Sequence, residues 1–292
     1  LAPVEMALNQ WPVAQRAKKG WENLSELLGA VPEQAARTPL PKPRAHLVAK
    51  TLTVVPPGEK QASLKAINFE VKPGQAVGVI GPSGAGKSTL ARTLTGVWAP
   101  AGGSIRLAAA ALHQYEPAVL GKHIGYLPQR VQLFDGTIAE NIARLDAAPD
   151  AEKVVAAAKA AAAHEMILEF PQGYDTPIVA GQVRLSGGQM QRIGLARALY
   201  DDPVIVVLDE PNSNLDNVGS QALNAAIRKL KSEGRSVLIM AHRPAAIQEC
   251  DTLMVLDGGM RIAFGPKDEV LKSMVKNHEQ IKAAPTAAGG MS

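Results

Sequence analysis

A glycine-rich loop supplies the first residues whose types and spacing could act on a phosphate. The loop GPSGAGKST covers residues 81–89, after an apolar segment. Its glycines let backbone N–H groups turn toward phosphate oxygens, and a helix that begins at Ser88 would add its positive end. Lys87 can then reach the β- and γ-phosphates, and the Ser88 hydroxyl can hold Mg²⁺. The spacing predicts a nucleotide site built from Gly81, Pro82, Ser83, Gly84, Ala85, Gly86, Lys87, Ser88 and Thr89.

Two adjacent carboxylates, Asp209 and Glu210, end the apolar segment VIVVLDEP (204–211). Neighbouring residues of a strand point to opposite faces, so the two acids should have different tasks. We expect Asp209 to hold the metal, directly or through water, and Glu210 to act as general base on the attacking water. A solvated acidic pair is the alternative, and a phosphate loop in the same chain argues against it.

Two more polar residues follow apolar segments. His242 ends SVLIMAHR, which should reach the same edge of the sheet, so we expect a contact with the γ-phosphate. A structural histidine is the alternative. Gln129 in GYLPQ carries a neutral amide that could reach Mg²⁺ and water without competing as a base. Spacing alone leaves the role of Gln129 open.

The stretch LSGGQMQR (185–192) resembles a second anion site. Ser186 and Gln189 have the spacing of a capping box at the start of a helix. The box does not explain Gly187 and Gly188, which cost a helix about 1 kcal/mol each relative to Ala. Two glycines leave the first N–H groups of the helix open, where the helix dipole adds positive potential.

The elements that must position these groups alternate between strand and helix. Apolar strands at 76–80, 204–208 and 236–241 predict a parallel α/β sheet with both faces covered. Segments 46–55 and 62–71 read as strands around a turn, and a further strand pair closes the fold around 252–264. The Ala-rich run 151–170 predicts a packed helix because charged residues interrupt it.

Composition fits an ordinary soluble globular protein, with 46% hydrophobic and 20% charged residues in 292. No window approaches the 18 or so apolar residues of a membrane span. The single cysteine, Cys250, excludes an internal disulfide and fits a reducing compartment. The chain begins with Leu instead of Met, so we expect a further segment upstream.

Four segments are expected along the chain. Residues 1–36 read as a helical arm that Pro12 breaks or kinks, and 37–44 as a Pro-rich linker. Residues 45–275 form the nucleotide-binding domain, with a helical subdomain at about 130–200, and 276–292 form a flexible tail.

The motifs together identify a family resemblance. GPSGAGKST, LPQ, LSGGQMQR, VIVVLDEP, SNLD (213–216) and AHR, in this order, resemble the ATPase of ATP-binding cassette (ABC) transporters over about residues 45–270. The resemblance implies a P-loop NTPase (RecA-like) core with an antiparallel β subdomain and an inserted helical subdomain. It also implies a head-to-tail homodimer that holds two ATP–Mg²⁺, with Ser186, Gly187, Gly188 and Gln189 on the γ-phosphate of the partner's ATP. Asn214 and Asp216 would lie at the dimer seam, and Gln129 would link the site to the membrane domain.

A narrower resemblance rests on LFDGTIAENIARL (133–145), LDEPNSNLD and the leading arm. These are similar to the protease-exporting branch of bacterial type I secretion ABC transporters. That branch implies a transmembrane domain before the arm, a place at the cytoplasmic face of the inner membrane, a periplasmic adaptor, an outer-membrane channel and a secreted protein substrate. No nucleic-acid partner is expected.

The sequence departs from the family pattern in two places. LTVVPP (52–57) lacks the aromatic residue that usually stacks on adenine, so Val54 or Val55 would have to pack against the base. The glutamate that commonly precedes LSGGQ is also missing, with Ala180 near that place. Alternatives at this stage are a separate ATPase subunit of another ABC transporter, a soluble ABC protein acting on nucleic acid, and a nucleotide-gated module without hydrolysis.

Overall fold

The computed structural model describes residues 2–30, 40–179, 185–215, 217–242 and 244–274, and it divides the chain into two units, Leu1–Thr38 and Pro39–Ser292. In the first unit, α1 (Ala2–Ala30) runs through Pro12 without a break. The expected break at Pro12 is therefore wrong, while the alternative, a kink, stays a prediction. A proline removes one backbone N–H donor, and a helix of this length survives that loss. No helix among the described residues is long and apolar enough to cross a membrane.

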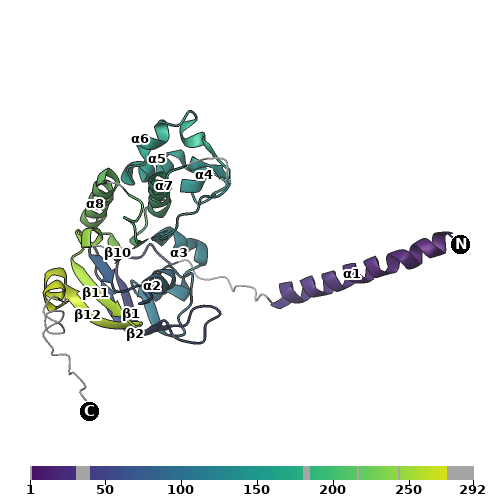
Figure 1. Cartoon of the computed structure of the whole chain (residues 1–292), viewed down its shortest axis with the longest axis horizontal. Coiled ribbons are helices and arrows are strands. Elements are labelled where there is room, and N and C mark those ends of the chain that lie inside the picture. Colours follow the sequence, from purple (N-terminus) through teal and green to yellow (C-terminus); the bar gives the residue numbers. More distant parts are fainter. Residues whose placement is uncertain (1, 31–39, 180–184, 216, 243, 275–292) are drawn as a thin grey trace, which may run out of the picture. The chain divides into compact units, whose positions relative to one another are not determined.

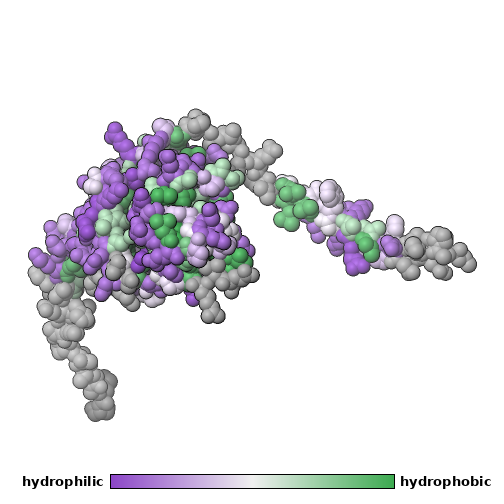
Figure 2. Space-filling view, turned by 90° about the horizontal axis from the view of Figure 1, so that it is seen from above, coloured by the Kyte–Doolittle hydropathy of each residue, from purple (hydrophilic) through white to green (hydrophobic). Residues whose placement is uncertain are grey.

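Helix α1 carries both polar and apolar side chains on its surface, as Figure 2 shows. Lys18 and Glu22 lie one turn apart at 3.8 Å, both well exposed. Among the side chains of this helix that the structure describes, the large exposed apolar ones are Trp11, Val13, Trp21, Leu24, Leu27 and Leu28.

A six-stranded sheet forms the centre of the second unit (Figure 1). Its order is β12-β11-β3-β10-β9-β6, and every neighbouring pair is parallel except β12 with β11. Strands β9 and β10 are buried along their whole length, as expected for continuous apolar runs covered on both faces. The carboxyl ends of the parallel strands therefore share one edge. The strands are β3 (Ala76–Ile80), β6 (Ile124–Leu127), β9 (Ile205–Asp209), β10 (Ser236–Ala241), β11 (Thr252–Asp257) and β12 (Met260–Pro266).

Helices and a second sheet cover the two faces of this sheet, each with its own apolar core. One core joins the central strands to α2 (Lys87–Leu94) and to the antiparallel sheet β2-β1-β4-β5. The other core joins them to α8 (Asn217–Ser232) and to the helical subdomain. This is the expected arrangement of a parallel core, an antiparallel subdomain and an inserted helical subdomain. The antiparallel strands are β1 (Leu47–Val54), β2 (Leu64–Val71), β4 (Gly102–Leu107) and β5 (Ala110–Ala111).

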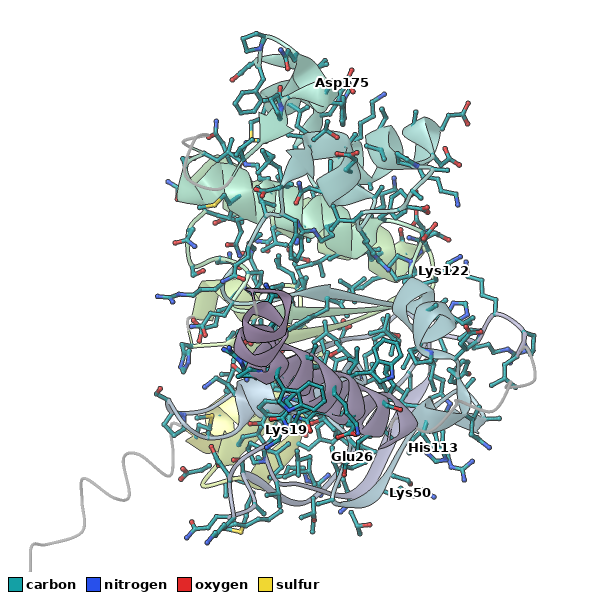
Figure 3. All side chains as sticks on the ribbon, turned by 90° about the vertical axis from the view of Figure 1, so that its right-hand side faces the viewer. Lys19, Glu26, Lys50, His113, Lys122 and Asp175 are labelled. Atoms are coloured by element: carbon teal, nitrogen blue, oxygen red, sulfur yellow. The ribbon has the colours of Figure 1, made fainter. Side chains whose placement is uncertain are left out.

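The helical subdomain holds the short helices between β6 and β9. Figure 3 places Asp175 at its far end, away from Lys50 of the antiparallel sheet. Its elements are β7 (Gly136–Thr137), α4 (Ile138–Ile142), α5 (Ala151–Ala160), α6 (His164–Leu168), β8 (Pro177–Ile178) and α7 (Gly187–Leu199). Helix α3 (Pro117–His123) precedes β6 and packs in the core that holds α2.

One helix expected in this subdomain is two helices. The run 151–170 forms α5 and α6 because Ala162 between them has a left-handed backbone, with φ of 51°. The amide of Ala163 returns to the carbonyl of Ala158 at 2.8 Å, which closes the end of α5. Tertiary packing of Ile167, which is fully buried, overrides the helix propensity of the alanines.

The remaining expected boundaries fall partly outside the described residues. Residues 40–44 of the expected linker have no regular secondary structure, and residues 37–39 and the expected tail at 276–292 lie outside the described ranges.

Candidate functional site

The glycine loop follows β3 and leads directly into α2, at the sheet edge where the parallel strands end. A side chain at Gly81 would place its Cβ atom 2.1 Å from the Leu256 carbonyl oxygen, and one at Gly86 would meet the Ser63 carbonyl oxygen at 2.8 Å. Gly86 also has φ of 99°, in the left-handed region that favours glycine. These glycines let the loop pack against neighbouring backbone while its N–H groups and the first turn of α2 remain available to an anion.

Lys87 is buried at the base of the loop, with 5% of its surface exposed. Its ammonium donates hydrogen bonds to the carbonyls of Gly81 at 2.9 Å and Pro82 at 2.8 Å. Burial lowers the pKa of Lys87, and the nearby Glu210 and Asp209 carboxylates partly offset this by favouring the charged form. The Lys87 ammonium is therefore held by two carbonyl oxygens, and a phosphate oxygen can take their place as the hydrogen-bond acceptor.

Ser88 and Asp209 form the part of the site that fits a divalent cation. Burial raises the pKa of Asp209, and a hydrogen bond from the Ser88 hydroxyl acts against that rise. Asp209 Oδ1 is buried and has no hydrogen-bond partner among the described residues. A buried carboxylate oxygen without a donor beside a hydroxyl matches the oxygen ligands that Mg²⁺ prefers.

Gln129, Glu210 and His242 converge although they lie far apart in the sequence. The Gln129 amide donates to Glu210 Oε2 at 3.0 Å, and His242 Nε2 lies 2.7 Å from Glu210 Oε1. Both oxygens of the Glu210 carboxylate thus have a partner. Glu210, His242 and Gln129 therefore form one cluster. The first two were expected at this sheet edge, whereas spacing alone left the role of Gln129 open.

Glu210 itself has a strained backbone. Its φ of 51° is left-handed, which is uncommon for a residue with a Cβ atom. Its amide donates to the Met240 carbonyl at 2.9 Å, which keeps it attached to β10. Strain of this kind persists where the surroundings fix the conformation.

The segment LSGGQMQR begins α7 with the expected capping box. The Ser186 amide donates to Gln189 Oε1 at 2.8 Å, and the Gln189 amide donates to Ser186 Oγ at 3.2 Å. Ser186, Gly188 and Gln189 line a cavity of about 640 Å³ with residues of α6, α8 and the loop after β9. A separate cavity borders the start of the glycine loop.

The two glycines of this segment have a packing role that the sequence did not suggest. A Cβ atom at Gly188 would lie 3.2 Å from the Asn214 carbonyl oxygen, and one at Gly187 would lie 3.4 Å from Asn214 Cβ. Gln191 was also missed. It is 2% exposed and donates to the Pro211 carbonyl at 3.0 Å, and Asn214 Nδ2 donates to its Oε1 at 3.4 Å. Gln191 connects α7 to the loop after β9 through Pro211. In the sequence, the one sign of this contact was a second glutamine two residues after Gln189.

The remaining expected site residues have different outcomes. Val54 is fully buried in the antiparallel subdomain, so the expectation that it contacts adenine is not supported; Val55, half-buried, is the one of the pair that a base could reach. The alternation of a strand explains this, because neighbouring side chains face opposite ways. Asn214 is exposed beside Gly187 and Gly188. Asp216 and Ala180 lie outside the described residues.

A polar clamp ties the loop after Gln129 to α7. Asn141 is fully buried and bonds both the amide and the carbonyl of Phe134, at 2.8 Å each. Arg197 of α7 donates to Asn141 and to the Gln132 carbonyl, all at 2.8 Å. These hydrogen bonds tie the segment that follows Gln129 to α7, the helix that Ser186 caps.

The family model described as "ABC transporter" matches residues 64–213 of the chain. The chain belongs to the ABC transporter family. It is 49% identical over 276 residues, 94% of this chain and 47% of the relative, to "Type I secretion system ATP-binding protein PrsD" of Rhizobium meliloti (strain 1021). It is 37% identical over 93% of this chain and 46% of the relative to "ATP-dependent lipid A-core flippase" of Alkalilimnicola ehrlichii (strain ATCC BAA-1101 / DSM 17681 / MLHE-1).

A solved ABC transporter has the same fold. "Structure of a bacterial Atm1-family ABC exporter with ATP bound" superposes with a TM-score of 0.76 at 30% identity, covering 93% of this chain and 48% of that chain. The chain thus spans about half the length of the relatives it matches. These findings confirm the P-loop NTPase fold of the ABC type and identify a nucleotide-binding ATPase domain.

Proposed function

We propose that the chain is the nucleotide-binding domain of an ABC exporter and that it hydrolyses ATP to ADP and phosphate to drive protein secretion. The observation that carries the hydrolytic part is the cluster at the sheet edge, where both oxygens of Glu210 are held by Gln129 and His242. A general base must be oriented before it can act, and this arrangement orients it.

Each residue of the cluster has a role in in-line attack of water on the γ-phosphorus. The water oxygen forms a bond to phosphorus, the bond from phosphorus to the leaving ADP oxygen breaks, and Glu210 takes the proton of the water. Lys87 offsets the charge of the β- and γ-phosphates, and His242 contacts the γ-phosphate. Mg²⁺, held by Ser88, Asp209 and Gln129, would neutralise charge on the phosphate oxygens.

The working unit in this proposal is a homodimer with ATP at its interface. Ser186, Gly188 and Gln189 lie on a cavity other than the one that borders the glycine loop, which supports their use on the partner's nucleotide. Asn214 and Asp216 would lie at the seam. The N-terminus of α7 adds positive potential to the γ-phosphate that the partner's loop holds.

Mixing two damaged chains tests this arrangement. Lys87→Ala removes the loop lysine, and Ser186→Arg places a bulky side chain at the start of α7, so each homodimer should be inactive. A mixed dimer keeps one intact site, made from the loop of one chain and the α7 of the other. We expect mixing to restore activity, to about a quarter of wild type for random pairing and independent sites. Continued inactivity after mixing contradicts a shared site.

The export role rests on the relatives. PrsD is 49% identical over nearly the whole chain, while the lipid A-core flippase is 37% identical, which favours protein secretion. The chain would then act at the cytoplasmic face of the bacterial inner membrane with a transmembrane domain, a periplasmic adaptor, an outer-membrane channel and a secreted protein substrate.

Secretion can be tested in cells that carry the full-length transporter containing this chain. Lys87→Ala should abolish the appearance of a protein substrate in the medium while lipid A-core transport continues. Loss of lipid A-core transport with unchanged protein secretion would support the flippase function instead.

A further inference from the structure

Residues 128–134, the segment that contains Gln129, belong to neither a helix nor a strand. Gln129 is exposed, yet its amide reaches Glu210 Oε2 at 3.0 Å. A segment without its own ladder of backbone hydrogen bonds keeps its shape through contacts with its surroundings. The contacts of this segment therefore decide where the Gln129 amide lies.

Helix α7 holds the segment first through a packing slot at Gly194. A Cβ atom on Gly194 would lie 2.8 Å from both Cγ atoms of Val131 and 3.1 Å from Leu127 Cδ1. Val131 thus lies against α7 at a place where a glycine leaves room for it. Leu133, two residues on, packs against the apolar core that contains Ile193 of the same helix. Two apolar side chains therefore fix the segment to the helical subdomain.

Arg197, one turn after Gly194 on α7, binds the polar groups of the same segment. Its guanidinium donates to the Gln132 carbonyl and to Asn141 Oδ1, both at 2.8 Å, and lies 5.4 Å from the centre of the Phe134 ring. Asn141 in turn holds the amide and the carbonyl of Phe134. One guanidinium therefore contacts the segment at two residues and fixes it through a third side chain.

We propose that Arg197 is a positioning residue for ATP hydrolysis, which fixes residues 131–134 on α7 and thereby places the Gln129 amide against Glu210. Without this anchor the amide leaves Glu210 Oε2, and the carboxylate is oriented less often for attack by water. ATP binding uses the glycine loop, so it stays unchanged. This role rests on the proposed hydrolytic function of Glu210.

Lysine substitutions at two neighbouring arginines separate positioning from stabilisation of α7. Arg144, half-buried like Arg197, donates to carbonyls at the C-terminal end of α7 and in α3. Within the described chain, none of its hydrogen bonds goes to residues 129–134. Lysine keeps the charge at either position but lacks the planar fork of arginine. The pair therefore differs in its effect on the Gln129 segment.

The measurement is steady-state hydrolysis by the whole chain at saturating ATP and Mg²⁺, below the melting temperature of every variant. We expect Arg197→Lys to lower kcat about three- to tenfold with an unchanged KM for ATP, and Arg144→Lys to keep kcat within about twofold of wild type. Arg197→Gln, which can still donate to one acceptor, should change kcat in the same direction and serves if Arg197→Lys does not fold. Equal loss of kcat at the two arginines overturns the proposal.

A double variant shows whether Arg197 acts through Gln129. Gln129→Ala removes the amide itself, so adding Arg197→Lys to it should lower kcat no further. Losses that multiply in the double variant overturn the proposal, because a helix that is merely weakened reduces turnover whatever residue stands at position 129. A wild-type chain that hydrolyses no ATP would instead contradict the proposed function.

Crystal structures of the wild-type and Arg197→Lys chains test the placement directly, whatever the activity. In the wild type, the Gln129 amide should lie within hydrogen-bond distance of Glu210. In Arg197→Lys, that contact should be lost while the capping box of Ser186 and Gln189 remains. An unchanged contact between Gln129 and Glu210 in Arg197→Lys overturns the proposal even if the chain is an active ATPase.

Discussion

Replacing Glu210 by glutamine tests the assignment of the general base with the smallest change in shape. The carboxylate accepts from Gln129 at 3.0 Å and pairs with His242 at 2.7 Å. Glutamine keeps one acceptor oxygen and places an NH₂ donor at the other position, so one of the two contacts must reverse its polarity. Gln129 can supply the acceptor if its amide turns to present its oxygen. His242 can supply it in the tautomer whose Nε2 carries no proton.

The cost to folding and the cost to catalysis should differ widely. Exchanging a charge-assisted hydrogen bond for a neutral one weakens folding by about 1 kcal/mol. Removing a general base lowers kcat about 10²- to 10⁴-fold, which corresponds to about 3–5 kcal/mol in the barrier. ATP binding should persist, because Lys87 and the glycine loop are unchanged.

The assay combines single-turnover phosphate release, nucleotide binding and size-exclusion chromatography with ATP–Mg²⁺. We expect Glu210→Gln to bind ATP, to remain as a dimer and to release phosphate very slowly. Glu59→Gln, an exposed carboxylate between β1 and β2, is the control with unchanged turnover. Phosphate release by Glu210→Gln within about threefold of wild type would refute the assignment, since no positioned base contributes so little.

Three further predictions concern packing and reactivity. Gly78→Ala should lower the free energy of unfolding by about 1–3 kcal/mol, because its Cβ would lie 2.6 Å from Leu253 Cδ2 and 3.0 Å from Cys250 Sγ; an unchanged melting temperature contradicts this. Ala162→Gly should raise stability by up to about 1 kcal/mol in thermal unfolding, since glycine relieves the left-handed backbone at φ of 51°; a fall in melting temperature argues against strain there. Burial raises the pKa of Cys250 from 9.0 to about 12. Because the thiolate is the reactive form, alkylation at pH 8 should be about 1000-fold slower in the folded chain than after denaturation. Equal rates in the two states would be inconsistent with a buried thiol. Because the folded pKa is the higher one, the stabilisation from this neutral thiol is complete below pH 9 and is lost as the pH rises through about 12.

The parts of the fold that could be predicted are those set by local pattern. Continuous apolar runs such as 204–208 have the length and composition of buried parallel strands, and β9 and β10 are fully buried. The capping box of Ser186 and Gln189 depends on residues three apart, so it needs no tertiary information. Both features are confirmed.

The parts that failed depend on partners distant in the sequence. Ala162 ends α5 because the chain must turn to bury Ile167, which no alanine propensity can indicate. Gln129 was expected at the site and does lie against Glu210, but spacing left its role open because the contact depends on β6 and β9 being neighbours in the sheet. The burial of Val54 likewise follows from which face of β1 meets the core.

Three unfavourable features lie within four residues at the end of β9. Asp209 has a buried oxygen without a donor in the described chain, Glu210 a left-handed backbone, and Asn212 a second such oxygen. Random defects would be spread over the core. Here they lie at the end of a fully buried strand, which pairs in parallel with β10 and β6 through Ile239 and Leu127 on either side of Leu208. Such local conflict in a well-packed sheet marks groups whose partners arrive with the substrate. The same stretch should therefore become more resistant to hydrogen exchange when ATP–Mg²⁺ binds.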